Sequence, residues 1–445
     1  MYTENEHSII NTERLFHKNK FDGGAMADDV YVCIDLKSFY ASVECAARGL
    51  DPFTTNLVVA DPSRGPGALC LAVSPGLKAK GVRNRCRLFE IPPSLKYITA
   101  LPRMGLYMEV SADIYNVYLH FFSAEDVYAY SIDECFIHAS PYLAMYRKDG
   151  MALAEMMMKA VYERTGICAT AGVGTNLFLA KIAMDIVAKH VPEHIAYLDE
   201  GIFKETLWYH RPLTDIWNIG KGIARRLQKY GVYDLHGVTL LPPEMLYKEF
   251  GVNAKYLIDH AHGREPCTLQ DIHSYRPRAR SIHTGQVLFE DYTYEEGEIL
   301  LYEMAELLIQ QMLGQGLAAR GISLYAGYSG RERKGSSGSR KLDGYTDVPE
   351  DIWQAFHQLY QDKVIPRLGI RTLRLALEDV APADEVPRHF SLFRSPWEEE
   401  RQKKVELAMM DIKSKFGKNA LLRGIDYFPK ATLRSRNGLI GGHHE

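Results

Sequence analysis

The chain has 445 residues, which at roughly 100–200 residues per domain allows about two to four domains. Of these residues 46% are hydrophobic and 24% are charged, a composition typical of globular proteins. Its formal net charge is −3, so the chain as a whole is not basic enough to attract nucleic acid. Any basic surface that binds nucleic acid therefore has to be local. The sequence contains no run of about 18 apolar residues, no signal-peptide core and no CxxC pair, so we expect a cytoplasmic protein with free thiols, without a membrane span and without structural zinc.

Strands and helices alternate through the first part of the chain. Residues 1–27 are expected to be a flexible N-terminal extension, after which VYVCID (30–35) predicts a buried strand ending in Asp35. Further strands are predicted at 56–60, 68–74 and 167–173, and helices at 103–123, 151–164 and 176–190. This alternation predicts an α+β core over residues 28–195.

Two neighbouring acids stand in YSIDECFI (130–137), where Asp133 and Glu134 separate the strand-like arms VYAYSI and CFIHAS. Adjacent strand residues point to opposite faces, so both carboxylates can serve one site only if the chain turns between the arms. A solvated hairpin turn is the ordinary explanation. A metal site is the other, with Asp35 as a third ligand if the two strands are neighbours, because Mg²⁺ prefers oxygen ligands.

The next segment, residues 196–265, is predicted to be all-helical, and within it IWNIGKGIARRLQKYGV (216–232) resembles a helix-hairpin-helix element. Backbone N–H groups at a glycine-rich helix start suit a phosphate. Asn218 stands where this motif usually has its first glycine. We expect the tip and the following turn to contact DNA through Gly220, Lys221, Gly222 and Arg225. An ordinary turn between two helices is the alternative.

A linker at residues 266–280 leads to a second α+β pattern at 281–380, which predicts a small two-layer domain. Its glycine-rich stretch 318–341 carries six basic residues against one acid, which suits contact with a phosphate backbone. The DNA contacts expected there are Arg331, Arg333 and Lys334. A solvated basic loop is the alternative. Residues 381–445, with a charged helix at 396–416, are expected to be a tail rather than part of a core.

Three segments together resemble the motifs of the Y-family, the translesion DNA polymerases: CIDLKSFYASVE (33–44), YSIDECFI and AGVGTNLFLAKIAMDIVAKH (171–190). Their order and spacing match over residues 28–380, and details such as VSPGLKAKGV are closer to the bacterial UmuC-like branch. The resemblance implies a right-hand polymerase fold with palm, small fingers, a helical thumb and a little finger domain. It also implies error-prone, template-directed synthesis past damage in an SOS-type response, on primer-template DNA with deoxynucleoside triphosphates.

The resemblance further implies a metal site. Asp35, Asp133 and Glu134, with the Leu36 carbonyl, would hold two Mg²⁺ ions. In such a site one ion lowers the pKa of the primer 3′-hydroxyl and the other neutralises the triphosphate. That chemistry needs no nucleophilic serine or cysteine.

Nucleotide contacts follow from the same resemblance. Tyr40 would lie under the sugar and clash with a 2′-hydroxyl, as a steric gate, while the N–H groups of Phe39 and Tyr40 would face the triphosphate. Lys78 occupies the family's basic fingers position, and Lys189 supplies a second cation on an alignment that carries one extra residue in DIVAKH. Pro75 replaces a phosphate-contacting tyrosine of some members. The resemblance places the fingers in an insertion at about residues 46–96, and the small residues of this segment imply a roomy site and low fidelity.

A pentapeptide near the end, HFSLF, resembles the bacterial sliding-clamp-binding motif, usually written QLSLF. It follows a proline-containing linker and consists of His389, Phe390, Ser391, Leu392 and Phe393. Its Leu and Phe would enter an apolar pocket of the clamp. A local hydrophobic contact with the preceding domain is the alternative.

Two other classes of protein share part of this sequence pattern. A polymerase-shaped DNA-binding protein without chemistry would not need its three acids and its steric gate. A nucleotidyl cyclase shares a palm-like acid pair, but it has no use for a helix-hairpin-helix element, a basic last domain or a clamp-type pentapeptide. The sequence therefore favours the polymerase.

Overall fold

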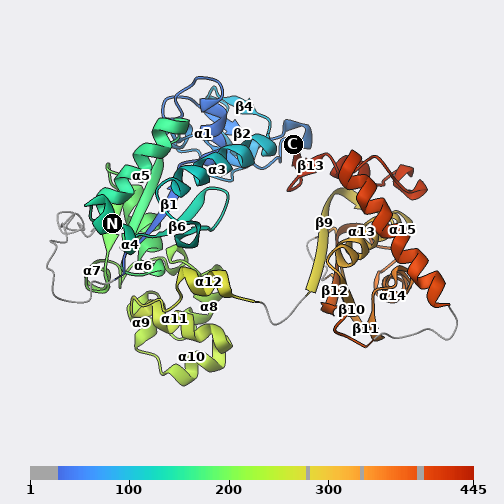
Figure 1. Cartoon of the computed structure of the whole chain (residues 1–445). Helices are drawn as coiled ribbons and strands as arrows, with labels where there is room; N and C mark the ends of the chain where they lie inside the picture. The colour runs from blue at the N-terminus through green and yellow to red at the C-terminus, as the bar shows by residue number, and fades with distance from the viewer. Residues whose placement is uncertain (1–28, 277–280, 331–334, 388–394, 445) are drawn as a thin grey trace, which may run out of the picture. The chain divides into compact units, whose positions relative to one another are not determined.

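The computed structural model describes residues 29–276, 281–330, 335–387 and 395–444 (Figure 1). The chain divides into two compact units, one ending at Tyr275 and the other running from Arg276 to His444. Each unit has its own apolar core, and each is described by itself. In the described part of the chain, no helix is both long enough and apolar enough to cross a membrane.

The first unit is built on a five-stranded sheet with the order β5-β6-β1-β7-β8. Its strands are β1 (Tyr31–Leu36), β5 (Val127–Ala129), β6 (Glu134–His138), β7 (Ala169–Gly174) and β8 (Ile195–Leu198). The central strand β1 is antiparallel to both neighbours, and all of its residues except Asp35 are buried. An apolar run buried on both faces is what the sequence predicted for this segment, and the structure confirms it.

Helices pack against this sheet, as Figure 1 shows for α5 and α6. The helices are α3 (Met104–Leu119), α4 (Ser140–Tyr146), α5 (Gly150–Thr165) and α6 (Leu177–Ile182). Glycine is required where α6 crosses β7, because a Cβ on Gly172 would lie 2.2 Å from the carbonyl oxygen of Ala180. A Cβ on Gly174 would meet the Ala180 nitrogen at 2.3 Å. The AGVG segment thus lets helix and strand approach closely.

The insertion predicted at about residues 46–96 forms a small three-stranded sheet with the order β3-β2-β4. Its elements are β2 (Leu57–Val59), β3 (Ala72–Val73), β4 (Ile98–Ala100) and α2 (Pro75–Lys78), and α1 (Phe39–Ala46) precedes it. It has a core of its own, centred on Val58, Cys70 and Leu77. All seven cysteines of the chain are free, as the scattered spacing predicted.

The helical segment that follows shares one apolar core with α6 and β8. Its helices are α7 (Glu200–Thr206), α8 (Lys221–Gln228), α9 (Leu235–Thr239), α10 (Pro243–Phe250), α11 (Ala254–Ala261) and α12 (Leu269–Ser274). Short helices joined by tight turns confirm the all-helical prediction for residues 196–265. The prediction of a linker at 266–280 is wrong for its first part, because α12 lies there and Leu269 is buried in the core of the first unit. Because the core is continuous, these helices are tied firmly to the sheet of the first unit.

The second unit is a two-layer α+β domain, as predicted. Its sheet has the order β11-β10-β12-β9 and consists of β9 (Ser281–Tyr292), β10 (Leu317–Tyr328), β11 (Ser336–Thr346) and β12 (Ile370–Pro382), all antiparallel. Helices α13 (Tyr294–Gly314) and α14 (Pro349–Lys363) pack on it. Leu300, Phe356 and Leu373 are fully buried between the two layers.

The expectation of a tail beyond residue 381 is wrong. Helix α15 (Pro396–Phe416) packs against α13 and α14 and belongs to the second unit (Figure 1). Beyond it, the backbone N–H groups of Thr432 and Leu433 donate to Glu303 of α13 over 2.9–3.0 Å. The remaining short elements are α16 (Leu433–Arg436), β13 (Leu439–Ile440) and β14 (His443–His444).

The buried face of α15 explains why its sequence looked like a tail. Glu399 and Glu406 are both buried, and Lys403 forms an ion pair with Asp347. Met409 is the one apolar residue among the buried positions described on this helix. Since the helix is anchored by charge, its sequence lacks the apolar periodicity that normally indicates burial.

Candidate active site

The pairing of β1 with β6 places the predicted acids together at one end of the sheet. Asp35 lies directly opposite Glu134 in the register. The backbone N–H of Leu36 donates to the carbonyl oxygen of Asp133 over 2.9 Å, and the N–H groups of Tyr130 and Ser131 both donate to the Glu134 carbonyl. The predicted hairpin between β5 and β6 is therefore confirmed, and its turn brings three carboxylates to the end of β1.

Two lysines separate the negative charges. Lys189 Nζ lies 3.0 Å from Asp35 Oδ2, and Lys181 Nζ lies 2.7 Å from Glu134 Oε1. Asp185 bridges them, at 2.8 Å from Lys189 and 2.9 Å from Lys181. The result is a row of alternating charges, Asp35–Lys189–Asp185–Lys181–Glu134. Sequence analysis singled out neither Lys181 nor Asp185, although both lie in the segment that carried the family resemblance.

Burial sets the electrostatics of this row. Burial raises the pKa of Asp35 to about 6, while the Lys189 ammonium opposes that shift. Lys181 is 4% exposed, and burial alone would lower its pKa. The neighbouring carboxylates outweigh burial and raise the pKa of Lys181 above its usual range. Lys181 therefore stays charged and holds Glu134 in place.

The reach of Lys189 depends on a local change of helix type. After α6 the chain continues as a π-helix from Ala183 to Val187 and as a 3₁₀ turn from Ala188 to His190. A π-helix closes its hydrogen bonds over five residues instead of four and accommodates one extra residue, often at functional sites. This π-helix includes Asp185–Val187 of DIVAKH, the segment where the family resemblance implies one extra residue. It turns Lys189 toward Asp35, with Asp185 between the two lysines.

Two serine hydroxyls also fix the turn between β5 and β6. Ser111 of α3 donates its hydroxyl to the Ile132 carbonyl over 2.6 Å. Ser131 donates to Asp133 Oδ1 over 2.7 Å. These bonds hold the Asp133 carboxylate at the tip of the turn, where it is partly exposed to solvent.

The residues predicted to contact a nucleotide lie beside the acids. Tyr40 stacks on Tyr107, with ring centroids 4.5 Å apart and planes 15° apart. Phe39 is buried and begins α1, whose first N–H groups have no partner within the helix. Lys78 ends α2 and is half-buried, and burial lowers its pKa while the charge of Asp35 opposes that shift. The Lys78 ammonium therefore lies close enough to Asp35 for the two charges to interact.

Tyr107 is itself held by a buried acid that sequence analysis did not identify. Glu44 is fully buried and accepts hydrogen bonds from the Tyr107 hydroxyl at 2.8 Å and from Arg103 at 2.8 and 2.9 Å. Arg48 contacts the same carboxylate. The acid fixes Tyr107, and Tyr107 supports the ring of Tyr40.

The helix-hairpin-helix tip is exposed where α8 begins. Asn218 has φ of 65°, a left-handed conformation that favours glycine and that asparagine tolerates better than most residues. The substitution at the first glycine position therefore leaves the turn intact. The four predicted tip residues are exposed: Gly220, Lys221, Gly222 and Arg225. The other predicted contacts, Arg331, Arg333 and Lys334, and the clamp-type pentapeptide 389–393 lie outside the described residues.

The donor atoms at the end of β1 suit magnesium. In the described part of the chain, no three His, Cys, Asp or Glu side chains gather closely enough to hold a metal ion by themselves. Mg²⁺ keeps several waters and binds through one or two carboxylates together with substrate phosphates, so it does not need a closed protein cage. Asp35, Asp133 and Glu134 provide carboxylate oxygens of that kind on neighbouring backbone positions.

Comparison with known proteins identifies the family. A model described as impB/mucB/samB family matches residues 34–185, and one described as impB/mucB/samB family C-terminal domain matches residues 279–390. UvrX of Bacillus subtilis (strain 168), whose name connects it with UV-damage repair, is 32% identical over 93% of this chain and 97% of its own length. The chain belongs to the impB/mucB/samB family.

Other members of the family support the same assignment. "DNA polymerase IV 2" of Halalkalibacterium halodurans is 26% identical and covers 94% of this chain and 100% of its own length. A solved structure, "Y-family DNA polymerase chimera Dbh-Dpo4(243-245)-Dbh", matches with a TM-score of 0.61 at 20% identity, over 79% of this chain and 99% of that one. The fold is that of a Y-family DNA polymerase, so the resemblance seen in the sequence is confirmed.

Proposed function

We propose that this chain extends a DNA primer by two-metal-ion nucleotidyl transfer, with Asp35, Asp133 and Glu134 as the metal-binding acids. The single observation that carries the proposal is the register of β1 and β6, which sets Asp35 opposite Glu134 and hydrogen-bonds Leu36 to Asp133. Family membership supports the reaction, and this geometry supports the choice of the three acids.

Bound Mg²⁺ would lower the pKa of the primer hydroxyl and offset the charge of the triphosphate. The Leu36 carbonyl follows Asp35 directly and is proposed as a further ligand. Lys181 orients Glu134 through their 2.7 Å contact. Lys189 holds Asp35 in the absence of nucleotide and is free to turn to a phosphate, because 37% of its side chain is exposed.

The nucleotide is proposed to lie between the palm acids and the fingers. Lys78 faces its phosphates, and the first N–H groups of α1, at Phe39 and Tyr40, bind the triphosphate as helix N-termini bind anions. The Tyr40 ring, supported by Tyr107, lies where a 2′-hydroxyl would clash. The enzyme therefore selects deoxynucleotides by shape.

We propose DNA synthesis past template damage as the role of this activity. The UV-damage repair named for the 32% identical relative supports it. Exposed Gly220, Lys221 and Gly222 at the start of α8 are proposed to contact the duplex backbone, and Arg331, Arg333 and Lys334 are proposed to contact it as well.

Primer extension with Mg²⁺ and deoxynucleotides, on undamaged and abasic templates, tests this function. Wild type is run beside Asp35→Asn and a matched control, Glu155→Gln, an exposed acid of α5. We expect wild type and control to extend both templates and Asp35→Asn to lose about three orders of magnitude in rate, because it removes a ligand worth several kcal/mol. DNA binding without extension by any protein would favour the binding-module alternative.

A sliding clamp is proposed as the partner of the pentapeptide 389–393, on its sequence alone. Pull-down with a bacterial β clamp should retain wild type and lose the double variant Leu392→Ala and Phe393→Ala. Equal retention of both proteins would exclude this segment as the contact.

A further inference from the structure

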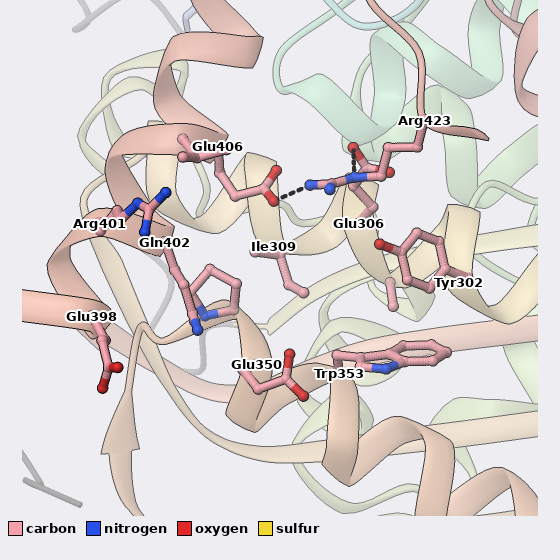
Figure 2. Close-up of a pocket in the computed structure, with 13 residues that line it drawn as sticks. Tyr302, Glu306, Ile309, Glu350, Trp353, Glu398, Arg401, Gln402, Glu406 and Arg423 are labelled. Atoms are coloured by element: carbon pink, nitrogen blue, oxygen red, sulfur yellow. Dashed lines mark hydrogen bonds and ion pairs between the residues drawn. The ribbon is translucent and has the colours of Figure 1, made fainter. Parts of the chain in front are cut away.

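A cavity of about 610 Å³ lies within the second unit, between α13, α14 and α15 (Figure 2). Its size is typical of small-molecule sites in proteins. The metal-binding acids lie in the first unit, so neither the metal site nor the nucleotide site proposed above accounts for it. Its principal lining residues are Tyr302, Glu306, Glu350, Trp353, Gln402 and Glu406.

Two hydrogen-bond acceptors in this cavity have no partner among the described residues. One is Oε2 of Glu306, a residue that is only 6% exposed, and the other is Oε1 of Gln402. Buried acceptors without a partner are rare in native proteins, and each one calls for an explanation. A third buried atom of the lining, Arg423 Nε, also lacks a hydrogen bond, although it lies 3.1 Å from Glu306 Oε1 and is neutralised there. The two orphaned oxygens have no such neighbour, so the group that would satisfy them has to be a donor.

The orientation of Glu306 is fixed by its other oxygen. Oε1 accepts from Gln310 Nε2 at 2.8 Å and lies 3.1 Å from Arg423 Nε. Gln310 also donates to Glu406, and Arg423 also contacts Glu406. Arg423 is therefore already shared between two acids, which leaves Oε2 of Glu306 for another donor.

The charge of the lining is negative. Four glutamates line the cavity against two arginines, and one of these, Arg401, lies over the Trp397 ring at 5.5 Å. Lys413 lies 3.7 Å from Glu306 and offsets one further charge without reversing the sign. A positively charged occupant would complete this balance, whereas an anion would face repulsion.

Aromatic rings stand at one end of the cavity. Tyr302 and Trp353 meet edge to face with centroids 4.8 Å apart, and Figure 2 shows both rings on the opposite side of the cavity from Arg401 and Gln402. Aromatic faces attract cations, and tryptophan does so most strongly. Ile309 adds an apolar surface suited to an alkyl stem.

We propose that this cavity binds a guanidinium or alkylammonium group, which donates to Glu306 and Gln402 and lies against the aromatic end. A guanidinium has five N–H donors and an alkyl stem, which matches orphaned acceptors beside an apolar wall. The same chemistry occurs in small free amines and in the arginine side chain of a partner protein.

Calorimetric titration of the full-length protein tests the proposal. The probes are butylguanidinium, its uncharged analogue butylurea, and the peptide acetyl-Gly-Arg-Gly-amide. We expect butylguanidinium or the peptide to bind at least about tenfold more tightly than butylurea, because charged donors strengthen hydrogen bonds. Binding of butylguanidinium itself assigns the site to free small cations, and binding of the peptide alone assigns it to a protein segment. Both outcomes support the site.

Variants place the binding in the cavity. Glu306→Gln and Trp353→Leu should each weaken binding at least about tenfold, whereas the exposed Glu295→Gln of α13 should not change it. Trp353→Leu keeps the buried acid network, so it serves if Glu306→Gln does not fold. Equal affinity for butylurea, no binding of any charged probe, or binding that both cavity variants retain would overturn the proposal.

Discussion

The two units of the chain bury charge in different ways. At the end of β1, acids and lysines alternate along one row, and each carboxylate in it faces an ammonium within 3.0 Å. Between α13 and α15, Glu306 and Glu406 share Arg423, and acids outnumber bases. In the first arrangement three acids and two lysines alternate, so that every carboxylate of the row has a cation beside it, and the row is partly open to solvent. The second joins a helix to a domain and leaves unsatisfied acceptors beside a cavity.

The largest effect is expected from Lys181→Met, which breaks the row of alternating charges. It leaves Glu134 without its cation, whereas Asp185 keeps its ion pair with Lys189, and an uncompensated buried charge costs about 3 kcal/mol or more. We expect urea unfolding of the first unit to show that loss. Lys159→Met, at a position that is 74% exposed, should change the free energy of unfolding by less than about 0.5 kcal/mol. Equal effects of the two variants would mean that the row does not stabilise the fold.

A smaller effect is expected from Arg423→Met in the second unit. The variant leaves Glu306 and Glu406 facing each other, but the arginine is 29% exposed, so solvent screening reduces the loss to about 2 kcal/mol. Hydrogen exchange along α15 should become faster, while Lys415→Met on its exposed face should have no effect. Unchanged exchange in Arg423→Met would show that apolar contacts, and not charge, hold α15.

The variant Tyr40→Ala tests whether Tyr40 is the steric gate of the nucleotide site. We expect the ratio of ribonucleotide to deoxynucleotide insertion to rise by about tenfold or more, because the clash with the 2′-hydroxyl is removed. Tyr107→Phe keeps the stacked ring and removes only the bond to Glu44, so it should change the ratio less. Steady-state insertion of the two nucleotides measures both. Identical ratios in Tyr40→Ala and wild type would exclude Tyr40 as the gate.

The smallest effect is a dependence of stability on pH. Burial opposes ionisation of Glu44, but hydrogen bonds from Arg103, Arg48 and Tyr107 lower its pKa below the usual 4.5. Glu44 therefore contributes stability above that value, and the contribution is lost as the pH falls through the lower folded pKa. Urea unfolding between pH 5 and pH 3, with Glu44→Gln as the comparison, measures it. The variant should show a flatter pH dependence than wild type, and a slope equal to that of wild type would contradict this.

Much of the first site was predictable because its residues are neighbours in sequence or in register. The strand that carries Asp35 and the turn at Asp133 could be predicted from apolar runs and from the polar residues that end or interrupt them. The role of Asp185 was not predictable, because its position depends on a π-helix that helical periodicity does not reveal. Lys181 lies in α6, but its partner Glu134 is 47 positions away in the sequence. Glu44 was missed for a similar reason, since its partners Arg103 and Tyr107 come from a helix about sixty positions away.

The sheet of the second unit and its helices α13 and α14 were predictable from the sequence, but the packing of α15 against them was not. Helix α15 buries Glu399 and Glu406, residues whose side chains normally indicate solvent. The partners of Glu406, Gln310 and Arg423, lie 96 positions before it and 17 positions after it. Pairing of charge over such distances leaves no periodic signal in the sequence.

Single-turnover insertion of one deoxynucleotide tests the central claim most directly, with Glu134→Gln and Asp133→Asn compared with wild type and the control Glu155→Gln at matched occupancy of primer-template DNA. The account predicts that both site variants bind DNA as wild type does and insert the nucleotide about a thousandfold more slowly or worse. Insertion by either variant at the wild-type rate would contradict the assignment of these acids.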